Sequence, residues 1–173
     1  MKTILSGEQL SITIQRLAHQ IIENSPELAE TCIIGIQPRG IWLSSRIMQA
    51  INIIKPNHPI RYGVLDITFY RDDVRKELHV ANQTDIHFSI ENKKVILIDD
   101  VLYTGRTIRA ALDALMDFGR PRKVELCVLI DRRFSRELPI QPDYVGKAID
   151  SIITQRVKVG WKENSGKDEV ILL

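Results

Sequence analysis

The chain has 173 residues, of which 44% are hydrophobic and 27% charged, a composition typical of an ordinary soluble domain. The net charge of +2 is too small for a dedicated nucleic-acid-binding module, although it leaves room for a local basic patch. No apolar run approaches membrane-spanning length, and the N-terminus turns polar too early for a signal peptide. We therefore expect a single domain over residues 1–173 that makes no contact with a membrane.

The first half of the chain is predicted to alternate helices and strands. Apolar residues recur at helical spacing over Gly7–Glu23, where Ser6 is placed as N-cap and Gln9 completes a capping box. Residues 31–36 (TCIIGI) are expected to form a buried strand, and the turn at 37–40 leads into a helix at 40–54.

The middle of the chain continues this alternation. We expect a strand at 62–70, a long charged surface loop or a short hairpin at 71–88, an apolar strand at 95–100 and a helix at 107–118. Gly119 follows that helix as its expected stop. The side chains predicted to face the core from the helix are Ile108, Ala111, Leu112 and Leu115.

The last third of the chain adds three predicted strands. Residues 124–131 are apolar, and two weaker strands, at 156–161 and 169–173, are separated by a turn with the sequence ENSG. Strands that are apolar throughout and alternate with helices predict an α/β fold with a mostly parallel sheet. Ligands of such sheets bind beyond the carboxyl ends of the strands, so the residues that follow 31–36 and 95–100 are expected near a ligand.

The two cysteines, Cys32 and Cys127, each lie in an apolar run. Their spacing excludes a zinc ribbon, and no neighbouring residue is suited to activate either thiol. We interpret both as small buried hydrophobic side chains, which favours a reducing, cytoplasmic location.

The stretch VILIDDVLYTGRT, residues 95–107, carries the strongest functional pattern. Asp99 and Asp100 end a water-excluding strand, where such carboxylates can accept hydrogen bonds from a ribose or approach Mg²⁺ through water. Residues 103–107 then open a helix, whose free N–H groups and dipole suit an anion, while Gly105 lets the backbone come close. The alternative is a capped helix start with two solvated aspartates; neither GxxxxGK[ST] nor GxGxxG occurs.

The same stretch resembles the signature with which type I phosphoribosyltransferases bind phosphoribosyl pyrophosphate (PRPP). Together with GIQPRG, DITFYRDD, GRPRKVELCVLIDR and RELPIQPDYVGK, it is similar to the PyrR family, regulators of the pyrimidine operon that are also uracil phosphoribosyltransferases. The similarity covers nearly the whole chain. It implies the type I phosphoribosyltransferase fold, with helices on both sides of a twisted, mostly parallel sheet and a small hood formed by the terminal segments.

The resemblance implies a role for each residue of the PRPP site. Asp99 and Asp100 would bind the ribose hydroxyls and, with Arg39, carry catalysis. The family usually has threonine at the position of Pro38, so backbone amides and Arg39 must hold pyrophosphate without that hydroxyl. Mg²⁺ is the implied cofactor, bound through PRPP near the two aspartates rather than by the protein alone. The full set of implied PRPP-binding residues is Pro38, Arg39, Gly40, Asp99, Asp100, Val101, Leu102, Tyr103, Thr104, Gly105, Arg106 and Thr107.

Two further segments have implied roles in the reaction of PRPP with uracil, which gives UMP and pyrophosphate. A lid over the pyrophosphate would use Tyr70, Arg71, Arg75 and Lys76, although the pattern alone fits a solvated charged loop. The uracil ring is expected to stack near residues 101–103 and to be read by backbone groups around Val157 and Val159.

The resemblance also implies binding of the pyrimidine leader mRNA, regulated by UMP and UTP, and assembly into a homodimer or higher homo-oligomer. The positions that match those used for RNA are Arg16, His19, Arg136 and Lys147. Gln15, Asn24 and Gln141 depart from the expected threonine, arginine and arginine, which removes two cations per subunit. A solvated surface or an oligomer contact would explain the matching residues equally simply.

Two other functions stay open at this point. One is salvage of a purine base such as hypoxanthine or guanine, which DVLYTGRT alone does not exclude. The other is a non-catalytic RNA-binding regulator that senses PRPP or nucleotides. The intact acidic pair, Arg39 and the charged lid argue against a loss of catalysis.

Overall fold

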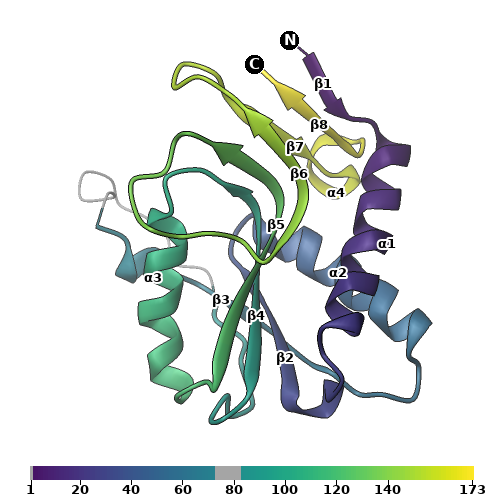
Figure 1. The fold of residues 1–173 in the computed structure, drawn as a ribbon, viewed down its shortest axis with the longest axis vertical. Helices are drawn as coiled ribbons and strands as arrows, with labels where there is room; N and C mark the ends of the chain where they lie inside the picture. The colour runs from purple at the N-terminus through teal and green to yellow at the C-terminus, as the bar shows by residue number, and fades with distance from the viewer. Residues whose placement is uncertain (1, 73–82) are drawn as a thin grey trace.

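A five-stranded parallel sheet forms the centre of the protein in a computed structural model, which describes residues 2–72 and 83–173 (Figure 1). All neighbouring strands in it run parallel, in the order β3-β2-β4-β5-β6. The strands are β2 (Thr31–Ile36), β3 (Arg61–Leu65), β4 (Lys94–Leu102), β5 (Lys123–Arg133) and β6 (Tyr144–Asp150). The predicted α/β fold class is therefore confirmed.

Helices cover both faces of this sheet. Helices α1 (Gly7–Glu23) and α2 (Gly40–Ile54) pack on one face, and α3 (Arg106–Leu115) packs on the other (Figure 1). Because strand side chains alternate between faces, Ile96 of β4 joins the core under α1 and α2, while Val95 joins the core under α3. This double burial explains why the central strands are continuous apolar runs.

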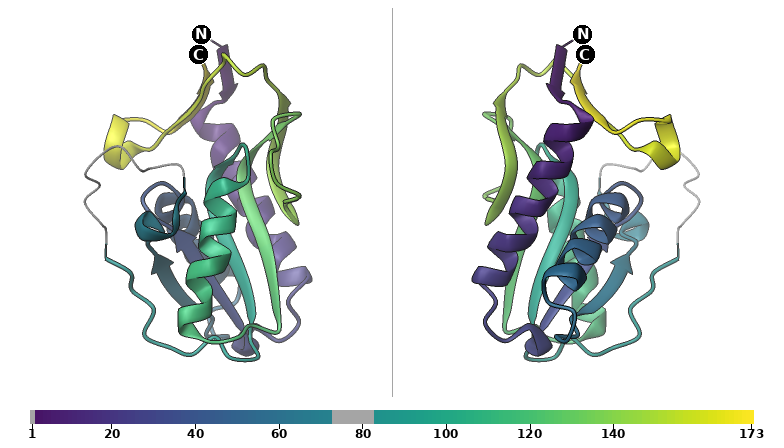
Figure 2. Two further views of the ribbon diagram at one scale, coloured as in Figure 1. Left: turned by 90° about the vertical axis from the view of Figure 1, so that its left-hand side faces the viewer. Right: turned by 90° about the vertical axis from the view of Figure 1, so that its right-hand side faces the viewer.

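A second, antiparallel sheet forms the hood. It has the strand order β1-β8-β7 and consists of β1 (Lys2–Leu5), β7 (Val157–Gly160) and β8 (Glu169–Leu172), with the short helix α4 (Lys162–Ser165) between the last two strands. Both chain ends meet in the hood, beyond the carboxyl edge of the large sheet (Figure 1). The arm formed by β7, α4 and β8 reaches out above α2 (Figure 2).

Several local predictions hold to the residue. Helices 7–23 and 40–54 and strand 31–36 have their predicted bounds. The Ser6 side chain accepts from the Gln9 amide, and the Gln9 side chain accepts from the Ser6 amide, so the capping box is confirmed. Such a cap contributes about 1 kcal/mol. Cys32 and Cys127 are buried and unpaired, as predicted.

Other local predictions are corrected. The strand predicted at 62–70 ends at Leu65, because the Asp66 carboxylate accepts from the amide and hydroxyl of Thr68 and starts a 3₁₀ turn, η2 (Thr68–Tyr70). The helix predicted at 107–118 ends as a 3₁₀ turn, η3 (Met116–Phe118). Leu112 points outward, since its side of α3 is not covered.

Three elements differ from prediction in kind. The ENSG turn is the short helix α4, and strands β1 and β6 were not predicted at all. A further short helix, η1 (Leu28–Glu30), precedes β2. Among the described residues, no helix is long and apolar enough to cross a membrane.

Candidate functional site

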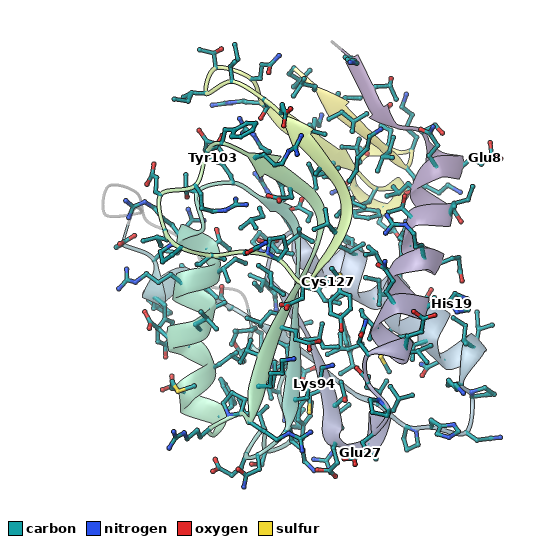
Figure 3. All side chains as sticks on the ribbon, in the orientation of Figure 1. Glu8, His19, Glu27, Lys94, Tyr103 and Cys127 are labelled. Carbon is teal, nitrogen blue, oxygen red and sulfur yellow. The ribbon has the colours of Figure 1, made fainter. Side chains whose placement is uncertain are left out.

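A cleft lies between the carboxyl edge of the large sheet and the hood. It consists of two adjoining cavities of about 320 and 1180 Å³, large enough together for a nucleotide-sized ligand. The lining residues common to both are Arg71, Asp99, Val101, Tyr103 and Thr107. Figure 3 places Tyr103 at this edge, Cys127 in mid-strand and Lys94 at the opposite edge.

The two aspartates at the end of β4 are almost fully enclosed, with 6% of Asp99 and 7% of Asp100 exposed. The Asp100 amide donates to the Asp99 carboxylate at 2.9 Å. Burial, and then the charge of Asp100, raise the pKa of Asp99 well above its usual value. Burial also raises the pKa of Asp100, against the opposing effect of the Arg39 guanidinium. Two enclosed carboxylates in this state require hydroxyl donors or a cation as partners.

The 103–107 loop follows the aspartates and opens α3. Gly105 has a φ of +95°, a conformation that other residues adopt only with strain, and α3 begins at the next residue. The loop lines the smaller cavity, so the free amides at the start of α3 face a space suited to an anion. Arg106 is engaged elsewhere: its Nε donates to Glu137 at 2.7 Å, and its Nη1 donates to Asp72 at 3.2 Å.

The 37–40 turn lies against the same strand end. The Gln37–Pro38 peptide is cis, Pro38 and Arg39 are exposed to the cleft, and Gly40 begins α2. A Cβ on Gly40 would clash with the Ile98 carbonyl oxygen, so only glycine allows the turn to pack this closely on β4. This contact brings Arg39 near the two aspartates, consistent with its effect on their pKa values.

The hood supplies the opposite wall of the larger cavity. Val157 and Val159 of β7 line it, together with Trp42 and Trp161. The sequence analysis gave these valines a role from the family resemblance alone. In the structure they line the same cavity as Asp99, which lies at the end of β4.

Arg132 of β5 was missed as a site residue. Its Cζ lies 4.0 Å from the centre of the Tyr103 ring, its Nε donates to Ser151 at 2.8 Å, and only 5% of the residue is exposed. The signal in the sequence was a basic residue two positions after the apolar part of β5, where the strand reaches the carboxyl edge. A buried arginine there stiffens the aromatic wall of the cleft.

The predicted lid is only partly brought to the cleft. Arg71 lines both cavities, while the Tyr70 hydroxyl donates to the Asp117 carboxylate, next to α3. Arg75 and Lys76 lie outside the described residues.

Three of the four residues predicted to bind RNA lie around α1 and β6. Arg16 donates to the carbonyls of Val145 and Gly146 at 3.2 and 2.5 Å, and Lys147 donates to the Ile4 carbonyl at 3.0 Å. His19 is exposed on the outer side of α1 (Figure 3). The fourth, Arg136, turns instead to the 103–107 loop. The altered positions Gln15, Asn24 and Gln141 are all exposed.

Comparison with known proteins identifies the class of protein to which this fold and cleft belong. A family model described as "Phosphoribosyl transferase domain" matches residues 1–164. The hypoxanthine phosphoribosyltransferase of Trypanosoma cruzi has the same fold, with a TM-score of 0.75 at 18% identity over 100% of this chain and 96% of that one.

Curated relatives narrow this class. "Bifunctional protein PyrR" of Elusimicrobium minutum is 47% identical over 99% of this chain and 96% of the relative. The protein of the same name from Chloroflexus aurantiacus is 45% identical over 99% of this chain and 94% of the relative. The chain therefore belongs to the PyrR family of phosphoribosyltransferases, as the sequence motifs predicted.

Proposed function

We propose that the protein transfers the phosphoribosyl group of PRPP to uracil, giving UMP and pyrophosphate. The observation that carries this proposal is the placement of two enclosed carboxylates, Asp99 and Asp100, directly before an anion-binding loop in one cleft. A ribose with a phosphate on its 5′ carbon requires these two kinds of group side by side. The two buried thiols agree with the reducing cytoplasm as the location of the reaction.

Each part of PRPP has a complementary part of the cleft. Asp99 and Asp100 accept hydrogen bonds from the ribose hydroxyls, and the amides of the 103–107 loop hold the 5′-phosphate. The 37–40 turn, with Arg39, holds the pyrophosphate on the other side of β4. Gly40 supports this assignment, because its close packing on Ile98 places the turn beside the carboxylates.

Mg²⁺ fits the acidic pair as a cofactor held mainly by oxygens of PRPP. Among the residues that the structure describes, no group of three or more His, Cys, Asp or Glu side chains could hold a metal ion. Asp99 and Asp100 would reach the ion directly or through water, and its charge would balance carboxylates whose pKa burial raises. When bound, the ion neutralises charge on the departing pyrophosphate.

The residues of the chain then have few chemical tasks. Arg39 and Arg71 place positive charge where the leaving group gains negative charge, and the hood excludes water from the cationic sugar. The uracil ring lies between the Tyr103 side of the cleft and the backbone of Val157 and Val159, which reads its polar edge. The carboxylates orient the ribose so that its C1′ faces the base.

The test is an assay of several bases with PRPP and Mg²⁺. Uracil is expected to release pyrophosphate and give UMP, with hypoxanthine and guanine turned over far more slowly. Pyrophosphate release with a purine and none with uracil would establish the salvage alternative instead. Binding of PRPP without turnover of any base would establish a non-catalytic sensor.

A second proposed function is binding of pyrimidine leader mRNA, with UMP or UTP as regulators. Arg16, His19 and Lys147 support it, because they gather where α1 packs on β6 and a homodimer would double that basic surface. A gel shift with the upstream leader of the pyrimidine genes tests it. We expect saturable, uridine-nucleotide-sensitive binding that weakens with salt. No such binding at low salt would leave only the enzyme.

A further inference from the structure

The segment of residues 136–138 packs against the 103–107 loop, although the two are more than 30 residues apart in the chain. We propose that Arg136 is a positioning residue for this loop, which it holds in the shape that binds the 5′-phosphate of PRPP and UMP. The inference rests on the proposed function. It gives Arg136 a role inside the nucleotide site, whereas the sequence resemblance implied a contact with RNA.

The contacts of Arg136 hold the loop from behind. Its Nη1 donates to the main-chain carbonyl of Tyr103 at 2.5 Å, and its Nη2 donates to the Asp131 carboxylate at 2.5 Å. The side chains of Arg136 and Asp131 are 22% and 13% exposed, so both are largely shielded from solvent. Asp131 belongs to β5, and the ion pair therefore ties the loop to the rigid central sheet.

The next two residues extend the same support. The amides of Glu137 and Leu138 both donate to the Thr104 carbonyl, at 2.9 and 3.2 Å. A Cβ on Gly105 would lie 3.3 Å from the side chain of Ile140 and 3.5 Å from that of Leu138, so this part of the loop also packs against the segment. The loop is thus backed along its length by one segment, in which Arg136 is the only side chain that donates to its main chain among the contacts described.

These contacts set the direction of the loop amides. In a trans peptide the C=O and N–H groups point in opposite directions. Because the carbonyls of Tyr103 and Thr104 are turned toward the 136–138 segment, the N–H groups of Thr104 and Gly105 are turned away from it. Both residues line the smaller cavity, so these two amides become available to an anion there. Without Arg136, the first peptide plane is free to rotate and present a carbonyl to the phosphate.

The ring of the same residue is held independently. Arg132 stacks on the Tyr103 ring, while Arg136 holds the Tyr103 carbonyl, so the two arginines constrain different parts of one residue. Loss of Arg136 is therefore expected to affect binding of the phosphate and to leave the aromatic wall of the cleft in place.

The experiment compares Arg136→Met with Arg133→Met as a matched control. Arg133 is two residues from Asp131 on β5, half exposed, and paired with the exposed Asp150. In Arg136→Met we expect the KM for PRPP to rise roughly tenfold to a hundredfold, as for loss of a charged hydrogen bond. Arg133→Met is expected to stay within twofold of wild type.

The inhibition constants of UMP and uridine, compared for each variant, measure the contribution of the 5′-phosphate to binding. Arg136→Met is expected to weaken UMP about tenfold or more and to leave uridine, which lacks the phosphate, within twofold. Equal weakening of both ligands would mean a general loss of structure and overturn the proposal. Arg136→Lys, which keeps the charge and one donor direction, is expected to recover part of the UMP affinity. It also keeps the test valid if the methionine variant folds poorly.

These experiments distinguish a failure of the proposed function from a failure of the positioning role of Arg136. A wild-type protein that turns over no base with PRPP would refute the proposed function itself. A wild-type enzyme that is active, with Arg136→Met unchanged in PRPP and UMP binding, would overturn only the positioning role. If that variant lost binding of leader RNA but kept its UMP binding, Arg136 would be an RNA-binding residue, as the sequence resemblance implied.

Discussion

The sheet side and the hood side of the cleft are built in different ways. On the sheet side, one continuous stretch, from the end of β4 into α3, supplies the carboxylates, the 103–107 loop and the start of the helix. On the hood side, the residues that line the cavity come from the C-terminal part of the chain, and β1 from the other end of the chain pairs antiparallel with β8 in the same small sheet. The groups proposed to bind the ribose and the 5′-phosphate of PRPP therefore adjoin in the sequence, with the 37–40 turn and the 136–138 segment packed against them; we call this side the donor half. The half proposed to read the base depends throughout on pairing between distant parts of the chain.

Arg46 makes polar contacts between these two halves. It lies on α2, which begins at the 37–40 turn, and its guanidinium pairs with Asp168 and Glu163 of the hood, each at 2.8 Å. Its Cζ also lies 4.6 Å from the centre of the ring of Trp161, a buried residue directly before α4. A single side chain thus links α2, the helix that follows the 37–40 turn, to the arm that carries β7.

The largest expected effect is on the sheet side. Asp100→Asn removes a carboxylate proposed to bind the ribose and the Mg²⁺ complex, and we expect kcat/KM to fall about a hundredfold or more. The fold should remain intact, because asparagine has nearly the same shape. Steady-state kinetics and thermal unfolding of the same preparation measure both quantities. Near-normal turnover would remove Asp100 from the site.

The pH dependence of stability provides the control for that variant. The pKa of Asp100 in the folded protein is raised above its usual value of 3.8, so folding favours the protonated form. Its contribution to the free energy of unfolding is therefore lost as pH rises from 3.8 through the raised pKa. Asparagine does not ionise, so Asp100→Asn is expected to unfold at a temperature equal to or a few degrees above wild type at neutral pH. A lower unfolding temperature at neutral pH would contradict the burial argument.

The difference between local sequence patterns and long-range contacts also explains which features could be predicted from the sequence. The pattern from β4 into α3 is local: an apolar strand, two acids, a glycine turn and a helix start are all adjacent, so the chemistry is readable without a fold. The capping box of Ser6 and Gln9 is readable for the same reason. Strand β1 was not, because its four residues become a strand only by pairing with β8 at the other end of the chain.

Two long-range contacts that the sequence analysis did not predict share this cause. Arg46 contacts Asp168 across 122 positions, and no local pattern in α2 distinguishes it from an exposed helical arginine. Arg136 matched a family position, but its contact with the Tyr103 carbonyl depends on how the segment after β5 folds back. Strand β6 was overlooked because polar residues interrupt it, as its edge position allows.

Arg46→Met tests whether the hood reads the base, with a smaller expected effect. Removing the guanidinium leaves Asp168 and Glu163 without their partner and loosens the arm, at a cost of about 1–3 kcal/mol in stability. We expect the KM for uracil to rise roughly tenfold and the KM for PRPP to stay within about twofold. Trp161 fluorescence, which reports on the contact between Arg46 and the arm, should change in parallel.

Lys167→Met is the matched control, since Lys167 pairs with Glu169 on the same arm but is 68% exposed. Such an exposed pair contributes little, so both KM values should stay near wild type. If Arg46→Met raised the KM for PRPP and left that for uracil unchanged, the hood would belong to the donor half, and the proposed division of the cleft would be wrong.

The smallest expected effect concerns a negative charge inside the donor half. Glu137 lines the smaller cavity and pairs with Arg106 of the loop, whose pKa is raised chiefly by that hydrogen bond. A carboxylate there repels an incoming phosphate, so Glu137→Gln is expected to lower the KM for PRPP about twofold to threefold. The pair is partly exposed, at 37% and 51%, so the gain should shrink as salt is raised from low to physiological ionic strength.

Glu8→Gln is the control, because Glu8 lies on α1 away from the cleft (Figure 3), and it should have no such effect. A higher KM in Glu137→Gln would mean that Glu137 orients Arg106 for the phosphate, so that the ion pair belongs to the binding geometry.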